Sequence, residues 1–226
     1  MKMKLILGIA ALGLSLPAMA WDLNPYVGVD AKWSKMGAQK GLGDTQVAKN
    51  YPQGDLFAGL KLNDWVGAEV GYESTTKKNR TVVTGSGQGF FGTSVTAGFP
   101  VSSTTKTRLA GFHANVVGFY PVLEECRVSL FASIGLARLK FSSDLNFDDV
   151  APIGMEYRRF VKRKWVPRVT AGVEHMLVEN FGIRAMVSWE KTSTFRNIFS
   201  KTSSSPLYVA PKNTTSAGLG AFYSFK

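Results

Sequence analysis

Apolar and polar residues alternate with a period of two in eight separate stretches of the chain. The clearest stretch is the last, residues 215–225. Its apolar face is formed by Ala217, Leu219, Ala221, Tyr223 and Phe225. Such alternation is typical of β-strands, and about ten residues is the length that a tilted strand needs to cross a bilayer. Because a lone strand in lipid leaves its amide groups without partners, the pattern favours a closed barrel.

Seven more stretches alternate in the same way, at residues 24–35, 56–62, 66–73, 110–116, 128–137, 168–174 and 183–190. Pro167 borders the sixth of the eight, and because proline cannot donate to a ladder, it predicts a bulge or a strand start there. Long and short connections alternate strictly along the chain. The long ones are residues 36–53, 77–106, 142–162 and 195–213. This order predicts an all-β fold, an eight-stranded antiparallel up-and-down transmembrane barrel with both ends on the periplasmic side.

The polar face of these strands separates a membrane barrel from a soluble one. A lipocalin-like barrel, apolar inside and polar outside, is the alternative. Here the polar face carries nine charges of both signs: Asp30, Lys32, Lys61, Glu69, Glu73, Arg168, Glu174, Arg184 and Glu190. An eight-stranded lumen is just wide enough for side chains, so we expect these charges to pair in two clusters that plug it. A narrow gated ion path is the other use of the same residues.

On the opposite face, the apolar rows end in basic residues on five strands: Lys35, Arg108, Arg138, Arg163 and Lys191. We expect them just above an aromatic girdle of Trp33, Tyr72, Trp165 and Trp189, with a second girdle of Tyr120, Phe181, Tyr223 and Phe225 at the other end. Long basic side chains can extend from an apolar surface to phosphate groups. The pattern therefore predicts a rim that contacts lipopolysaccharide, and solvated charges without specific lipid contacts are the alternative.

The ends and the charge of the chain fit an exported protein. Residues 1–20 combine Lys2 and Lys4, an apolar run and an Ala-Met-Ala ending, which predicts a signal peptide and leaves residues 21–226 as one barrel domain. The net charge of +11 falls to +9 without Lys2 and Lys4. Export argues against nucleic acid as the partner. The basic long connections favour outer-membrane lipid, lipopolysaccharide and host surface glycans instead.

Catalytic candidates are few. Only His113 and His175 could serve as histidine bases, and we expect His113 to be a packed lumen residue. The lipid A deacylase pattern resembles His-x-Ser, whereas His113-Ala114-Asn115 lacks the serine, and an omptin-type protease would need ten strands. The sequence has no metal-ligand spacing and no phosphate-binding glycine loop, and the single Cys126 cannot form an internal disulfide. We expect no catalytic, cofactor or metal site, and a lipid A-modifying enzyme is the less favoured alternative.

Two segments carry a family resemblance: Pro-Tyr-Val-Gly-Val-Asp-Ala-Lys-Trp at residues 25–33 and Ala-Gly-Leu-Gly-Ala-Phe-Tyr-Ser-Phe at residues 217–225. In them the chain resembles the small outer-membrane β-barrel proteins, the OmpA-like transmembrane domain and its opacity-protein relatives. The resemblance implies a Gram-negative outer membrane, extracellular loops and periplasmic termini. It also implies that the barrel-assembly machinery reads Tyr223 and Phe225. The expected role is structural or surface-interactive, with an occluded lumen and possible adhesion through basic loops, and a porin-like ion channel is the alternative.

Overall fold

In the computed structural model, the described residues are 23–38, 48–85, 89–90, 93–94, 100–123, 127–147, 157–192 and 211–225. They form β1 (Asn24–Ala38), β2 (Asn50–Lys61), β3 (Val66–Thr75), β4 (Lys78–Thr84), β5 (Gly89–Phe90), β6 (Thr93–Ser94), β7 (Val101–Leu123), β8 (Val128–Phe147), β9 (Tyr157–Met176), β10 (Phe181–Glu190) and β11 (Pro211–Ser224). The predicted signal peptide lies outside these residues. Within them, no helix has the length and apolar character needed to span a membrane.

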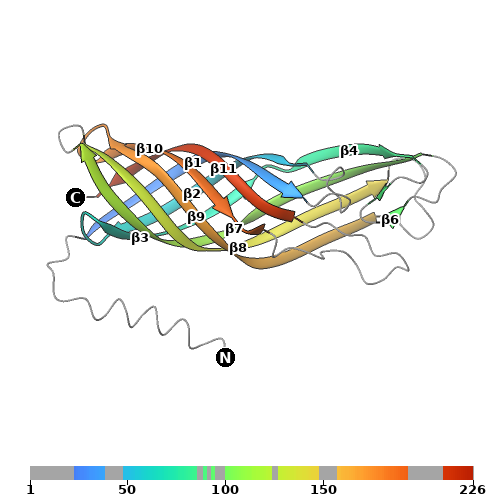
Figure 1. The fold of residues 1–226 in the computed structure, drawn as a ribbon, viewed down its shortest axis with the longest axis horizontal. Helices are drawn as coiled ribbons and strands as arrows, with labels where there is room; N and C mark the ends of the chain where they lie inside the picture. The colour runs from blue at the N-terminus through green and yellow to red at the C-terminus, as the bar shows by residue number, and fades with distance from the viewer. Residues whose placement is uncertain are drawn as a thin grey trace, which may run out of the picture.

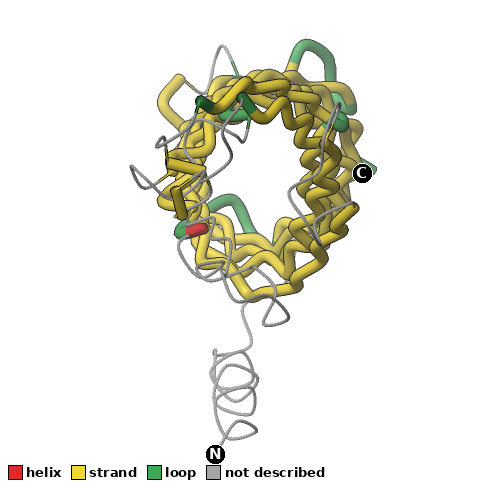
Figure 2. The backbone as a smooth tube through the Cα atoms, turned by 90° about the vertical axis from the view of Figure 1, so that its right-hand side faces the viewer, coloured by secondary structure: helices red, strands yellow, loops and turns green. Residues whose placement is uncertain are grey.

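The strands close into a barrel (Figures 1 and 2). Each strand pairs antiparallel with its neighbour in the order β3-β2-β1-β11-β10-β9-β8-β7-β4, and an additional β3–β7 pairing closes the ring. β3 pairs with one part of β7 and β4 with the next, so these two short strands occupy a single position in the wall. Counted over the described residues, eight strand positions make up the wall, which confirms the predicted fold.

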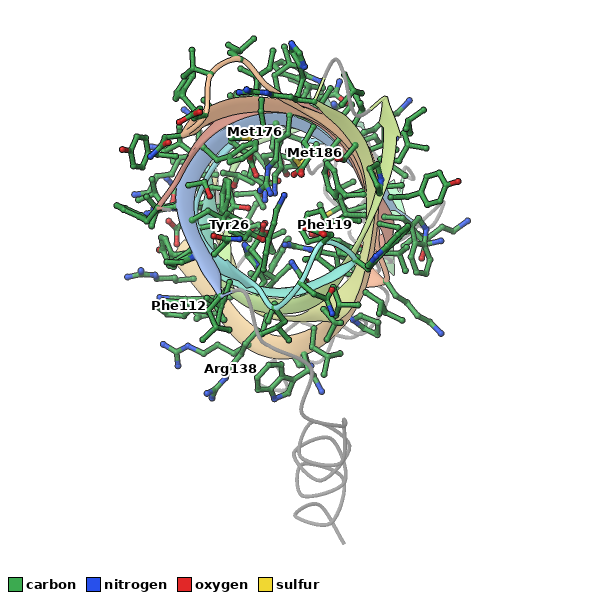
Figure 3. All side chains as sticks on the ribbon, turned by 90° about the vertical axis from the view of Figure 1, so that its left-hand side faces the viewer. Tyr26, Phe112, Phe119, Arg138, Met176 and Met186 are labelled. Atoms are coloured by element: carbon green, nitrogen blue, oxygen red, sulfur yellow. The ribbon has the colours of Figure 1, made fainter. Side chains whose placement is uncertain are left out.

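Side chains alternate between the two faces of the wall as the sequence pattern predicts. In β10 every second residue is buried, and the apolar Ile183, Val187 and Trp189 between them are exposed. Figure 3 shows Phe112 and Arg138 pointing away from the barrel, whereas Tyr26, Phe119, Met176 and Met186 point into it. Because exposed apolar rows cover the outside and polar groups line the inside, the barrel suits hydrocarbon rather than water.

Large apolar side chains also fill the interior near the short turns, which the sequence did not predict. The ring centroid of Tyr26 lies 6.1 Å from that of Phe57 and 6.2 Å from that of Phe222. The Tyr26 ring covers Gly59, where a Cβ atom would lie 2.1 Å from the ring. A glycine on the neighbouring strand therefore makes room for the ring. A second buried cluster consists of Val117, Phe119, Phe131 and Met186.

The predicted long connections contain more strand than expected. β8 runs to Phe147 and β9 begins at Tyr157, both inside the predicted connection 142–162. The predicted connection 77–106 likewise contains β4, β5, β6 and the start of β7. β1 and β2 extend into the predicted connection 36–53, and β11 begins inside 195–213. As Figure 1 shows, β4, β7, β8 and β9 project beyond β1, β2, β10 and β11 at the end away from the C-terminus.

Pro167 lies inside β9, and the β8–β9 register continues past it without a shift. The predicted bulge or strand start was therefore wrong. The carbonyl of Pro167 accepts a hydrogen bond from the Lys191 amide at 3.1 Å, one residue beyond the end of β10. In an antiparallel strand, the nitrogen and carbonyl of one residue face the same neighbour. The missing amide of Pro167 thus falls where β10 has already ended.

Candidate functional site

All nine charged residues expected in the lumen face the interior. Eight of them are buried, and the Lys61 side chain keeps 24% of its surface exposed. Asp55, Gln53 and His113 join them inside the barrel. Asp55 and Gln53 were missed because the predicted second strand began at Leu56. They share the phase of Lys61, so extending that strand backwards would have placed both inside.

Arg184 of β10 holds two acidic side chains from other strands. Its Nε and Nη2 atoms donate to the two carboxylate oxygens of Asp30 at 2.9 and 2.6 Å. Nη1 donates to Glu69 Oε2 at 2.7 Å, and the guanidinium lies 3.5 Å from the centroid of the Phe57 ring. The bidentate pair and the ring below it fix the guanidinium in one orientation.

Arg168 of β9 forms a second centre, donating to both Glu73 and Glu190. Lys32 connects the two centres, because its Nζ lies 2.7 Å from Asp55, 3.7 Å from Asp30 and 4.0 Å from Glu73. This linked network differs from the two clusters expected from sequence. Among the nine predicted lumen charges, Lys61 and Glu174 form a separate pair, 2.5 Å apart.

His113 is engaged on both sides of its ring. Nε2 lies 3.0 and 3.1 Å from the Asp55 carboxylate oxygens, and the Asn115 amide lies 3.2 Å from Nδ1. With Nδ1 accepting from Asn115, Nε2 carries the hydrogen and donates to Asp55. Ser133 lines the same small cavity, but the hydrogen-bond partners of His113 are Asp55 and Asn115. This arrangement orients a packed histidine rather than activating a nucleophile.

Asp55, Glu73 and His113 also bring potential metal-ligand atoms within 4.8 Å of one another. Protein cations already occupy this position, since Lys32 bonds Asp55 and Arg168 bonds Glu73. The cavity beside them has a volume of about 10 Å³, which is about the space of one water molecule. The set is thus satisfied within the protein's own ionic network.

The five residues of the predicted basic rim are exposed on the outer face, but they fall into two groups. Arg108, Arg138 and Arg163 lie on the adjacent strands β7, β8 and β9. The guanidinium of Arg138 lies 5.8 Å from the centroid of the Trp165 ring. Lys35 of β1 and Lys191, which follows β10, lie on the same outer face on either side of Thr215 of β11.

The first group belongs to a larger basic surface on the projecting ends of β7, β8 and β9, here called the basic sheet face. It consists of Lys106, Arg108, Arg138, Lys140, Arg159 and Arg163, which share the outward phase of the three strands. Asp144 is the one acidic residue in these rows, 3.5 Å from Arg159. The sequence analysis did not assign three of these residues to the surface: Lys106, Lys140 and Arg159. At the strand ends, apolar and polar residues no longer alternate, so the sequence does not mark which residues face outwards.

The amino-acid sequence matches the family model of the outer membrane protein β-barrel domain over residues 6–225. The chain belongs to this family. Among solved structures, Neisserial surface protein A is similar, with a TM-score of 0.55, 14% identity and coverage of 89% of this chain and 97% of that one. A major outer membrane protein of Thermus thermophilus has a TM-score of 0.51 and 13% identity, with 89% and 99% covered. Such low identities show the fold alone, and no curated protein matches significantly.

As an outer-membrane β-barrel of a Gram-negative bacterium, the protein contacts outer-membrane lipid and carries its short turns, the start of β1 and the end of β11 on the periplasmic side. The predicted assembly residues Tyr223 and Phe225 are exposed at this end, with ring centroids 5.1 Å apart. The amide of Phe225 donates to the carbonyl of Pro25, which ties the last strand to the first. His175 is half-buried on the outward side of β9, where it pairs with Val128 and Ile183.

Proposed function

We propose that this protein is a structural and surface-interaction protein with a closed lumen, anchored in lipopolysaccharide and able to bind anionic glycans. The basic sheet face carries the proposal, since it gathers six basic residues around one acid. Surface charge of one sign attracts anionic partners over a Debye length. Lipopolysaccharide phosphates next to the barrel and acidic polysaccharides beyond it both have the required chemistry.

The interior supports a closed barrel without catalysis. Each of the nine predicted lumen charges has an oppositely charged partner within 4.0 Å, and the cavity among them is about the size of one water. His113 is held by Asp55 and Asn115, so its ring has no nitrogen available for a nucleophile. These observations favour a scaffold over an enzyme.

The position of the rim arginines supports the lipid contact. Arg138 pairs with both Phe112 and Trp165, and these exposed aromatic side chains are of the kind that lies at a membrane interface. A guanidinium just above such a level can bind phosphate in a bidentate way. We therefore propose that Arg108, Arg138 and Arg163 bind the phosphates of lipid A.

The anchoring proposal predicts a medium-dependent loss of stability. Replacing Arg108, Arg138 and Arg163 together by Ser should lower the thermal stability far more in lipopolysaccharide-containing membranes than in detergent. The matched control replaces Lys49, Arg127 and Lys212 by Ser, which removes the same charge from exposed positions outside the basic sheet face. Equal losses in the two media would contradict the lipid contact.

The glycan-binding part predicts salt-sensitive adsorption to heparin, used as the anionic polysaccharide probe. Replacing Lys106, Lys140 and Arg159 by Gln should weaken heparin binding measured at low ionic strength, and salt should remove the difference. The Lys49, Arg127 and Lys212 variant serves again as the control for net charge. If both variants lose the same amount, the sheet face is not a binding surface and only the overall charge matters.

The proposal also includes recognition of Tyr223 and Phe225 by the barrel-assembly machinery. Both side chains are exposed at the end of β11, the strand that must find β1 to close the wall. Before this pairing forms, the end of β11 has no strand partner on its β1 side, so the assembly machinery can bind it there. Replacing both residues by Ser should reduce the amount of folded barrel in cells, measured by the heat-modifiable gel shift, without preventing refolding of the purified chain in detergent.

A further inference from the structure

A bent apolar groove crosses the lipid-facing surface of β9, β10, β11 and β1. Its outer part has a volume of about 510 Å³, and its lining includes Trp33, Ala171, Val187, Trp189, Thr215 and Ala217. Its inner part has about 550 Å³, and its lining includes Ala171, Val173, Ala185, Val187, Ala217 and Leu219. The two parts share Ala171, Val187 and Ala217, so they form one continuous depression.

The groove exists because small residues lie between large ones on neighbouring strands. Ala217 pairs with Trp33 on one side and Val187 on the other. Its small side chain leaves a depression between these two larger ones on the outer surface of β11. The larger side chain of Leu219, two residues further along β11, ends the depression on that strand. From there the groove runs over Ala185 of β10 and Ala171 of β9. From Thr215 to Leu219 the chain advances four residues, or about 13 Å at about 3.3 Å per residue. A segment of one acyl chain has the shape and polarity to fill this space.

The outer mouth of the groove is basic. Thr215 pairs with Lys35 on β1 and with Trp189 on β10, and Lys191 follows Trp189 by two positions. Lys35 and Lys191 are both exposed and form the second group of the predicted rim. Their ammonium groups can extend towards a phosphate above the apolar floor, because lysine keeps its charged end in the polar layer.

We propose that the groove binds one lipid A molecule, with an acyl chain over Ala217 and a phosphate held by Lys35 and Lys191. The proposal rests on the proposed function, since it gives the lipopolysaccharide contact a defined site. Lipid A is favoured because the mouth opens at the extracellular end of the barrel, where the outer leaflet carries this lipid. A second copy of the barrel fits less well, since its own Lys35 and Lys191 would meet like charges.

Native mass spectrometry of the full-length mature barrel, released from membranes containing lipid A, tests the site. We expect the wild type to retain one lipid A that the Ala217→Leu variant loses, because a leucine fills the low point of the groove. Ala68→Leu is the matched control, since Ala68 is an exposed lipid-facing alanine on β3, away from the groove. Replacing Lys35 and Lys191 by Gln should also release the lipid, and lipid A without phosphates should not be retained.

The outcomes separate this site from the wider function. Equal lipid A retention by Ala217→Leu, Ala68→Leu and the wild type would overturn the groove, and the test on Arg108, Arg138 and Arg163 would be unaffected. A dimer lost in Ala217→Leu would overturn it as well, because the groove would then join two copies. If Ala217→Leu loses the lipid while replacing the three rim arginines has no effect, the groove is supported and the rim assignment is wrong.

A heat-modifiable gel shift confirms that each variant folds. Ala171→Leu, which fills the same groove from β9, serves as a second variant.

Discussion

Arg184 is one of two buried arginines that each balance two carboxylates in the lumen. It compensates Asp30 and Glu69 at once, and all three side chains are at least nine-tenths buried. Such a group stabilises the barrel chiefly by preventing the cost of an unpaired buried carboxylate, since desolvation offsets much of the direct attraction. Its position over the Phe57 ring adds a contact that a lysine could not reproduce in the same geometry.

Replacing Arg184 by Met should therefore destabilise the barrel by about 3–5 kcal/mol, the range for breaking a buried ion pair. Urea unfolding followed by tryptophan fluorescence measures this loss. Adding Asp30→Asn and Glu69→Gln should recover most of it, because no uncompensated charge then remains. As a control, Arg159→Met breaks the exposed pair with Asp144 and should cost at most about 1 kcal/mol. Similar losses in the two single variants would contradict the role given to the network.

The lumen residues could be predicted from sequence because strand alternation assigns a face to every position. The same rule assigns Asp55 to the interior, and it was missed only because the start of β2 was set too late. The partners of each charge could not be predicted. Asp30 and Arg184 are 154 residues apart and meet because both pair with Gly220 of β11, which has no side chain between them. The β1–β11 pairing that closes the barrel brings them together, and neither strand predicts it alone.

At the scale of the elements, β9 illustrates how position decides the effect of a proline. Pro167 is tolerated because its nitrogen faces the place where β10 ends. Val169, two residues on, has the same orientation but pairs with Trp189 on β10 and Ile134 on β8. Its amide lies within the continuous wall, where an unmade hydrogen bond faces hydrocarbon instead of water.

Val169→Pro should therefore lower the yield of folded barrel sharply, while Pro167→Val should leave it close to that of the wild type. The first change removes a donor from a ladder inside the membrane, at a cost of several kcal/mol. The second restores a donor at an edge that does not need one. Refolding into detergent micelles, scored by the heat-modifiable gel shift, measures both. Equal yields would show that the β9–β10 ladder at Val169 is not required for closure.

The projecting strand ends were the least predictable elements. The start of β7, Ser102 to Thr107, is polar on both faces, so a period of two leaves no trace in the sequence. β4 is similar, with Lys78, Asn79 and Arg80 in succession. Pairing with a neighbouring strand, and not an apolar pattern, keeps these segments extended. The basic sheet face depends on this register, which explains why only half of its residues were recognised beforehand.

For the whole molecule, the interior is filled at successive levels. Tyr26, Phe57 and Phe222 pack together near the short turns, and the ionic network follows. Farther along, the inward side of β8 and β9 carries Leu139, Phe141 and Val166, all almost fully buried. An ion crossing the barrel would meet two apolar levels as well as a set of paired charges. The proposed closed lumen would thus be blocked at several levels and would not depend on one gate.

This arrangement predicts that water-soluble reagents do not reach the middle of the lumen. In a Cys126→Ala background, Ser133→Cys should react with a charged thiosulfonate at least about tenfold more slowly than Asn79→Cys, because exposure of the buried thiol requires local opening. Ser133 borders the small cavity, whereas Asn79 is exposed on β4. Planar bilayers containing the wild type should likewise carry no steady current. Comparable labelling rates together with a steady current would make the lumen a water-filled path, and the channel would then replace the closed scaffold.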